Sequence, residues 1–444
     1  MKLTILGGGG FRVPLVYGAL LADPDGPVTE VALYDTGAGR LKAVTAVLEQ
    51  QAAGVATAPR LSASTELAEA LRGADFVFSA IRVGGLRGRT IDERVALDLG
   101  VLGQETTGPG GLAYALRTVP VALEIARATT QHAPGAWFIN FTNPAGIVTE
   151  ALQPILGDRV VGICDSPIGL ARRAMHALRL DPASTTIDYV GLNHLGWLRG
   201  LESGGSNRLP ELLADAARLE QLEEGRLFGP QWLQALGAMP NEYLYYYYYT
   251  REALASIRGA EQTRGEYLLE QQHDFYDDVA KHPDHALATW QRVRADREAT
   301  YMRESRAEGE QRDAADVAGG GYEGVALDIM EAVSRGREST MILNLRAGGG
   351  VGLDADAVVE TPCIVGANGP VPQPVPPAKG HMLGLMQSVK AVERLVIEAV
   401  NTGSAAAAWE AFSLHPLVDS VNTGKALLDG YRRASPEVDA VFDR

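Results

Sequence analysis

The sequence predicts an α/β protein in which a Rossmann-type, doubly wound parallel sheet is followed by an α+β domain. Short apolar runs alternate with amphipathic segments of helical length over the first 166 residues. A run of glycines directly follows the first apolar segment, and long charged helical segments dominate after about Pro167. Strands that alternate with helices favour a parallel sheet with right-handed crossovers. We therefore expect a dinucleotide-binding domain over residues 1–166 and a substrate and oligomerisation domain over residues 167–444.

The individual elements of the first domain follow from their apolar patterns. Strands are expected over Lys2–Leu6, Val28–Tyr34, Ala74–Ile81, Ala136–Asn140 and Arg159–Cys164. Helices are expected over Phe11–Leu21, Ala38–Gln50, Gly111–Thr130 and Ala145–Leu152. Each helix stands between two strands, which is the order that a parallel sheet requires.

The second domain has a different pattern. A surface helix is predicted over Asp284–Glu308, and a second helix over Met382–Asn401. The short apolar segments Thr340–Leu345 and Val358–Val365 predict a small antiparallel sheet. The proline-rich stretch Gly369–Pro377 cannot be helical and is predicted to be an extended arm or loop.

Composition excludes several classes of function. The formal net charge of −15 argues against nucleic-acid and anionic-membrane partners, because binding to them needs a basic surface. Cys164 and Cys363 are the only cysteines, so no disulfide framework is expected and a reducing compartment fits. No stretch of about 18 uninterrupted apolar residues occurs, and the first residues lead straight into a strand pattern instead of a signal peptide. We expect a cytoplasmic protein.

The glycine run is the first candidate binding site. Gly7, Gly8, Gly9 and Gly10 stand between the first strand and a helix, where a dinucleotide site needs a tight turn and helix N-terminal amides for its pyrophosphate. Phe11 and Arg12 continue the turn, and the third position of a G-x-G-x-x-G pattern falls on Arg12 or Val13, so a purely structural turn stays open. Asp35 ends the second strand, where its carboxylate suits ribose hydroxyls and disfavours NADP.

A second candidate site follows a later strand. Cys164 ends an apolar run, and Ser166 and Pro167 are typical of an N-cap and a first helical residue. A thiol beside a helix N-terminus favours its thiolate, which suits a metal ligand, although a small buried apolar residue is the simpler interpretation. His194 ends another apolar run, where a structural histidine is equally in keeping. One cysteine and one histidine do not make a closed zinc site but suit an open one.

Several motifs, in order along nearly the whole chain, resemble those of glycoside hydrolase family 4, the NAD- and metal-dependent 6-phospho-glucosidases. They are Ile81-Arg82-Val83-Gly84-Gly85 with Arg89, Gly103–Gly111, Asn140-Phe141-Thr142-Asn143-Pro144, Ile163–Pro167, Gly191-Leu192-Asn193-His194, Pro240-Asn241-Glu242-Tyr243-Leu244 and Pro362–Pro370. The chain departs from the family at the turn, where Gly10-Phe11-Arg12-Val13-Pro14 replaces the usual Gly-Gly-Gly-Ser with a following Thr-Pro, so the nearby substrate or phosphate contacts are not carried over from the family.

The resemblance implies a fold like that of lactate and malate dehydrogenases and assigns roles to named residues. Cys164 and His194 correspond to the ligands of a divalent metal, usually Mn²⁺. Tyr243 corresponds to the proposed base, and Asp165 to the general acid of α-glucoside-cleaving members. Arg89, Asn143 and Arg264 correspond to substrate contacts. A homodimer or homotetramer is expected.

The resemblance also implies a reaction. NAD⁺ oxidises C3 of the sugar, the C2 proton is removed, the glycosidic bond breaks by 1,2-elimination, and water adds to the product. The substrate is expected to be a phosphorylated disaccharide or aryl glucoside, with the sequence closer to 6-phospho-β-glucosidases than to the α-specific members that Asp165 suggests. A plain NAD-dependent 2-hydroxy-acid dehydrogenase is the alternative from another class, but it would need a catalytic histidine motif that the downstream half does not show. A non-catalytic sugar-phosphate or NAD sensor is the other alternative, which the set Cys164, His194 and Tyr243 disfavours.

Overall fold

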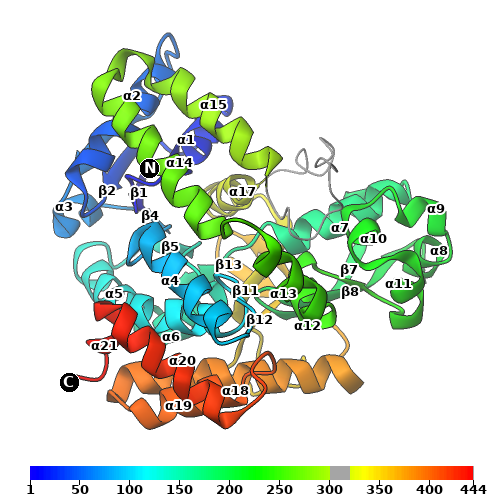
Figure 1. Ribbon diagram of the computed structural model, residues 1–444. Helices are drawn as coiled ribbons and strands as arrows, with labels where there is room; N and C mark the ends of the chain where they lie inside the picture. The colour runs from blue at the N-terminus through cyan, green and yellow to red at the C-terminus, as the bar shows by residue number, and fades with distance from the viewer. Residues whose placement is uncertain (301–320, 444) are drawn as a thin grey trace.

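A computed structural model describes residues 1–300 and 321–443 (Figure 1). One 13-stranded sheet runs through the molecule, with the order β10-β8-β7-β12-β11-β6-β5-β4-β1-β2-β3 and with β9 and β13 paired to β8 and β12. Its first six strands are β1 (Lys2–Leu6), β2 (Glu30–Tyr34), β3 (Arg60–Ser64), β4 (Phe76–Ser79), β5 (Trp137–Asn140) and β6 (Val160–Gly162). These six pair in parallel in the order 3-2-1-4-5-6. The predicted Rossmann-type sheet is confirmed.

The helices that cover this half also lie close to their expected places. They are α1 (Val13–Ala22), α2 (Ala38–Ala52), α3 (Leu67–Leu71), α4 (Gly85–Asp98), α5 (Pro109–His132), α6 (Ala145–Leu156) and α7 (Ser166–Ala177). Sequence analysis missed β3, because its residues Arg-Leu-Ser-Ala-Ser lie at the sheet edge, are largely exposed and carry no apolar run.

The remaining strands extend the same sheet instead of forming a separate one, which corrects the expected small sheet. They are β7 (Thr186–Leu192), β8 (Leu195–Ser203), β9 (Ser206–Asn207), β10 (Met239–Pro240), β11 (Ser339–Arg346), β12 (Val358–Gly366) and β13 (Gly369–Pro372). The predicted antiparallel pairing of β11 with β12 is confirmed. Strand β11 also pairs with β6 at Asn344 and Gly162, and β12 pairs with β7 at Glu360 and Gly191. The pairing of β11 with β6 joins the two halves, and the pairing of β12 with β7 carries the sheet on within the C-terminal half.

The proline-rich stretch is partly a strand. Gly369–Pro372 forms β13 and pairs with β12, whereas an extended arm or loop was expected over the whole of 369–377. Pro370 and Pro372 lie on an edge strand, where a missing N–H donor is tolerated.

Two helical layers pack on the sheet (Figure 1). Helices α14 (Arg264–Lys281) and α15 (Ala286–Ala299) cover α2, and Phe275 and Trp290 share a buried core with Phe11. Thus α15 is not the simple surface helix expected over Asp284–Glu308, of which residues 301–308 lie outside the described part. Helices α18 (Gly380–Thr402) and α19 (Ala405–Leu414) pack against α5 on the other side.

Shorter helices complete the fold. They are α8 (Leu209–Leu213), α9 (Ala216–Leu219), α10 (Glu223–Phe228), α11 (Pro230–Leu236), α12 (Tyr245–Tyr248), α13 (Thr250–Gly259), α17 (Tyr322–Arg335), α20 (Val421–Ala434), α21 (Pro436–Asp439) and a 3-10 turn, η3 (Glu242–Leu244). No helix in the described part is long and apolar enough to cross a membrane. The division at residues 166 and 167 stays a prediction.

Candidate functional site

A cavity of about 300 Å³ opens where the parallel strands end, the edge at which open α/β sheets place ligands. Chain segments that follow β4, β5 and β6 bring Arg82, Asn143 and Cys164 to its wall. The C-terminal half adds His194, after β7, and Tyr243, on η3. The seven residues predicted for metal, catalysis and substrate all line this one cavity: Arg89, Asn143, Cys164, Asp165, His194, Tyr243 and Arg264.

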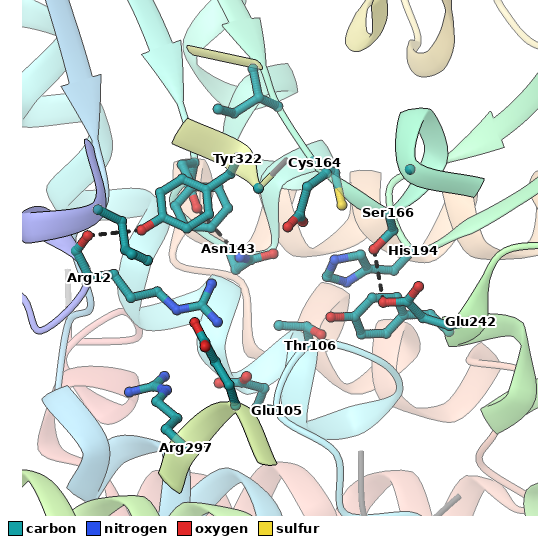
Figure 2. A pocket seen from close by; sticks show the side chains of 18 of the residues that line it. Arg12, Glu105, Thr106, Asn143, Cys164, Ser166, His194, Glu242, Arg297 and Tyr322 are labelled. Atoms are coloured by element: carbon teal, nitrogen blue, oxygen red, sulfur yellow. Dashed lines mark hydrogen bonds between the residues drawn. The ribbon is translucent and has the colours of Figure 1, made fainter. Parts of the chain in front are cut away.

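Cys164 and His194, remote in sequence, face the same space (Figure 2). Both are buried, and Nδ1 of His194 has no hydrogen-bond partner in the described protein. Burial lowers the pKa of His194 to about 4, so its imidazole is neutral at physiological pH. Burial, and then the nearby Glu360, raises the pKa of the Cys164 thiol well above its usual range. A neutral imidazole with an unused ring nitrogen beside a thiol is a donor pair that a cation would satisfy.

The backbone at His194 is unusual. Its φ angle of 62° lies in the left-handed region, where residues other than glycine are uncommon. His194 is in the two-residue link between β7 and β8, and its ring stacks on that of Tyr243 with centroids 3.7 Å apart. Such a conformation persists only where the surroundings hold it, and it is typical of functional positions. The hairpin therefore fixes the imidazole against the tyrosine ring.

An acidic region lies beside the cysteine. Helix α7 begins at Ser166 with Asp165 as its N-cap, one residue earlier than expected, and the Asp165 side chain makes no capping hydrogen bond. Ser166 Oγ instead donates to Glu242 Oε1 over 3.0 Å. Burial, with Glu223 nearby, raises the pKa of Glu242 to about 8. Sequence analysis missed Glu242, although the Pro-Asn-Glu-Tyr-Leu motif contained it.

The opposite end of the cavity is rich in arginine. Arg12, Arg82, Arg89, Arg264 and Arg297 line it. Glu105 binds Arg82 and Arg89 over 2.7 Å each, and although burial opposes this, the two cations hold the pKa of Glu105 at about 2.

Arg297 is the least balanced of these cations. Burial, followed by Arg12 and Arg264, lowers the pKa of Arg297 well below its usual range. Cations crowded in this way provide an anion site. Neither Arg297 nor Glu105 was predicted as a site residue: nothing in the local pattern marks Arg297, whereas the Gly103–Gly111 motif contained Glu105.

The glycine turn forms a second cavity, of about 340 Å³, beside the first. Gly7, Gly9, Gly10, Phe11, Arg12 and Asp35 line it as predicted. A Cβ atom on Gly7, whose φ is +78°, would stand 2.6 Å from the Ala80 carbonyl oxygen. Gly8 does not line this cavity, because it packs against Leu33 and its amide donates to the Tyr34 carbonyl. Six of the seven residues predicted for the dinucleotide site thus line one cavity.

Asp35 lies at the expected place, but its carboxylate already binds other groups of the protein. Its Oδ1 binds Arg40 Nη2 over 2.6 Å and accepts from the Gly37 amide over 2.8 Å, while Oδ2 accepts from the Gly9 amide over 3.2 Å. Sequence analysis missed Arg40, which lines the same cavity. A ribose hydroxyl at this carboxylate would therefore also meet a guanidinium group.

Three aromatic side chains of the C-terminal half hold the turn. Tyr276 Oη donates to the Gly9 carbonyl over 2.7 Å, and Trp290 Nε1 donates to that of Phe11 over 2.8 Å. Tyr322 Oη donates to the Arg12 carbonyl over 3.0 Å. Phe11, Arg12, Arg82, Asn143, Arg297 and Tyr322 line both cavities. The turn and the metal-ligand candidates therefore belong to one continuous site.

Comparison with known proteins agrees with this arrangement. The profile "Family 4 glycosyl hydrolase" matches residues 2–180, and "Family 4 glycosyl hydrolase C-terminal domain" matches residues 189–418. The probable 6-phospho-beta-glucosidase of Bacillus subtilis is 32% identical over 97% of this chain and 95% of its own.

Solved structures are similar over their full length. The 6-phospho-beta glucosidase of Thermotoga maritima, solved with manganese, NAD⁺ and glucose-6-phosphate, has a TM-score of 0.81 at 26% identity and covers 98% of both chains. A 6-phospho-alpha-glucosidase from gut microorganisms, solved with NAD and Mn²⁺, has a TM-score of 0.78 at 26% identity and covers 97% of both. A malate dehydrogenase of Plasmodium falciparum, at 11% identity with a TM-score of 0.50, covers 93% of this chain and 99% of its own and shares the fold alone.

Both halves of the chain match the family, and the similarity to its members extends over nearly every residue. The expected dehydrogenase-like fold is confirmed, and the plain 2-hydroxy-acid dehydrogenase is not the class to which the chain belongs. The chain belongs to family 4 of the glycosyl hydrolases and is a glycoside hydrolase.

Proposed function

We propose that this enzyme hydrolyses 6-phosphorylated glucosides, with a preference for the β anomer, and uses NAD⁺ together with Mn²⁺ or another divalent cation. The observation that carries the proposal is one cavity lined by Cys164, His194 and Tyr243 and also by the arginines described above. Figure 2 shows Cys164 and His194 on one side of this space and Arg12 and Arg297 on the other. The names of the similar enzymes include both anomers, with phosphorylated glucosides in common. A cytoplasmic homodimer or homotetramer stays a prediction.

The donor set suits an open metal site. His194 offers an unused ring nitrogen, and Asn143 Oδ1 is buried without a hydrogen-bond partner in the described protein. Within the described residues, no group of three or more histidine, cysteine or acidic side chains could hold a metal ion. Two protein ligands, Cys164 and His194, leave the other positions to substrate hydroxyls and water, which is the pattern of a catalytic metal instead of a structural one.

The glycine cradle suits the pyrophosphate of a dinucleotide. A Cβ atom on Gly10 would stand 2.9 Å from the Gly7 carbonyl oxygen, and one on Gly9 would meet Arg40 and Asp35. Only glycine leaves this surface open for close backbone approach. The turn leads into α1, whose N-terminal amides favour an anion.

Each of these residues is proposed to have a separate role toward a phosphorylated sugar. The arginine end, with Arg297 at its centre, holds the phosphate, and Asn143 orients the sugar ring. NAD⁺ held by the glycine cradle would supply a hydride acceptor for C3, and a cation held by Cys164 and His194 would supply the positive charge that acidifies the C2 proton. Tyr243 removes that proton, with its ring held against His194. Asp165 stands beside Cys164 to protonate the departing oxygen.

An assay with the two anomeric 4-nitrophenyl 6-phosphoglucosides tests the proposal. Activity should require both NAD⁺ and Mn²⁺, disappear with a chelator, and return when Mn²⁺ is restored. The β anomer should have the higher kcat/KM. Preference for the α anomer would overturn the anomeric part of the proposal and place the enzyme with the α-specific members. Full activity after removal of both cofactors would overturn the proposal.

Replacing Arg297 with methionine tests the phosphate assignment. The variant should raise KM for the phosphorylated substrate by roughly 10- to 100-fold, because one charge-assisted hydrogen bond contributes about 1.5–3 kcal/mol. Activity on the unphosphorylated glucoside, however low, should change little. The protein without ligands should unfold at the same or a higher temperature, because the lost cation is crowded by other cations. Equal losses on both substrates would contradict the assignment.

A further inference from the structure

A row of buried residues crosses the sheet next to the metal-ligand candidates. Gly162, Asn344, Glu360, Gly191 and Gly196 are register partners on β6, β11, β12, β7 and β8. Strand β6 ends in this row at Gly162, and the chain that follows it leads to Cys164; β7 ends at Leu192, and the link that follows it carries His194. Glu360 is therefore placed in the middle strand of the row, between the two segments that carry the proposed ligands.

The glycines in the row make room for polar side chains. A Cβ atom on Gly162 would stand 2.8 Å from Asn344 Cβ, and one on Gly196 would stand 2.2 Å from Tyr189 Oη. Asn344 Nδ2 donates to Glu360 Oε1 over 3.0 Å, and Tyr189 Oη donates to Glu360 Oε2 over 2.9 Å. Glycines at these two positions thus let two neutral donors reach one carboxylate.

Glu360 differs from the carboxylates of Asp92 and Glu105. Asp92 binds Arg117 over 2.6 Å, and Glu105 binds two arginines. Glu360 is fully buried, yet the two side chains that donate to it in these hydrogen bonds are both neutral. Asn344 alone stands between Glu360 and Gly162 in the row, and Gly162 lies two residues before Cys164. A buried carboxylate without a cation is costly to the fold and is normally paired or close to a metal.

We propose that Glu360 is a positioning residue that supplies a second negative charge to the metal site without binding the cation. The thiolate of Cys164 and the carboxylate of Glu360 together balance a dication, and His194 stays neutral. Partners of this kind, beyond the ligands themselves, govern metal affinity. This inference rests on the proposed function, because it assumes that Cys164 and His194 hold the cation.

Titration of the NAD-loaded enzyme with Mn²⁺, followed by the electron paramagnetic resonance signal of free Mn²⁺, tests the role of the charge. Glu360→Gln should weaken Mn²⁺ binding about 10- to 100-fold. Tyr189→Phe is the matched control, because it removes a hydrogen bond to the same carboxylate and leaves the carboxylate itself in place. Tyr189→Phe should weaken binding less than threefold. Without metal, Glu360→Gln should unfold at the same or a higher temperature than the wild type.

The other outcomes are decisive as well. Unchanged affinity in Glu360→Gln, or equal losses in Glu360→Gln and Tyr189→Phe, would overturn the inference. If Glu360→Gln does not fold, Glu360→Asp decides: it keeps the charge, so retained affinity supports the inference and a tenfold loss overturns it. A wild-type enzyme that binds no Mn²⁺ would refute the metal site of the proposed function itself, which a failure of the Glu360 variants alone would not.

Discussion

Replacement of Cys164 by serine is expected to lower kcat/KM by about 10³-fold or more, which corresponds to about 4 kcal/mol of transition-state stabilisation. The hydroxyl of serine is a far poorer ligand than a thiolate, and only His194 would then remain to hold the cation. His194→Ala should have a similar effect from the other side. Stopped assays with NAD⁺ and saturating Mn²⁺, together with direct Mn²⁺ titration, measure both variants.

Cys363 provides the matched control. It is also fully buried, it lies on β12, and its Sγ donates to the Thr361 carbonyl over 3.3 Å. It does not line the cavity. Cys363→Ser should therefore retain Mn²⁺ binding and activity after correction for any loss of folded protein. If Cys164→Ser and Cys363→Ser behaved alike, the effect would come from the fold and the metal assignment would be wrong.

The second large effect is expected for Tyr243→Phe. A general base contributes about 10²–10⁴-fold, so kcat should fall by about 10³-fold. The phenyl ring keeps the 3.7 Å stacking on His194, so Mn²⁺ and NAD⁺ should still bind. Exchange of the C2 proton with solvent deuterium, followed by nuclear magnetic resonance, should be lost in the variant.

Tyr249→Phe is the control for this prediction. Tyr249 belongs to the same run of tyrosines, but its hydroxyl donates to the Phe228 carbonyl over 2.6 Å and it does not line the cavity. Its variant should keep both turnover and C2 exchange. Exchange that persists in Tyr243→Phe would show that another group takes the proton, and Tyr246, which also lines the cavity, would be the next tyrosine to replace.

The parts of the fold and site that sequence predicted are those with local signals. Strand β1 with its glycines and the ends of β5 and β6 could be placed, because apolar runs and turn residues lie next to one another in the chain. The motif around Tyr243 distinguished this residue from the five other tyrosines close to it in the sequence. His194 could be named from its motif, but its left-handed backbone and its stacking on Tyr243 could not.

Contacts between distant segments account for what sequence did not predict. Arg297 and Trp290 lie on an ordinary charged helix, and only packing brings them to the glycine turn. The pairing of Asp35 with Arg40 depends on how α2 begins. Glu360 can be related to the proposed metal ligands only when the pairing of the four strands between them is known. Strand β3 was missed for the opposite reason, because its local pattern is weak while its pairing with β2 is complete.

The order of strands in the sheet has a consequence for synthesis of the protein. Strands β6 and β7 are neighbours along the chain, yet β11 and β12 are inserted between them. A nascent chain that has left the ribosome only as far as β10 would carry β6 as an open edge. That edge closes only after β11, residues 339–346, has emerged to pair with β6. The sheet is thus complete only late in translation. A fragment that ends at residue 166 would expose β6 as an unpaired edge strand that is prone to aggregation.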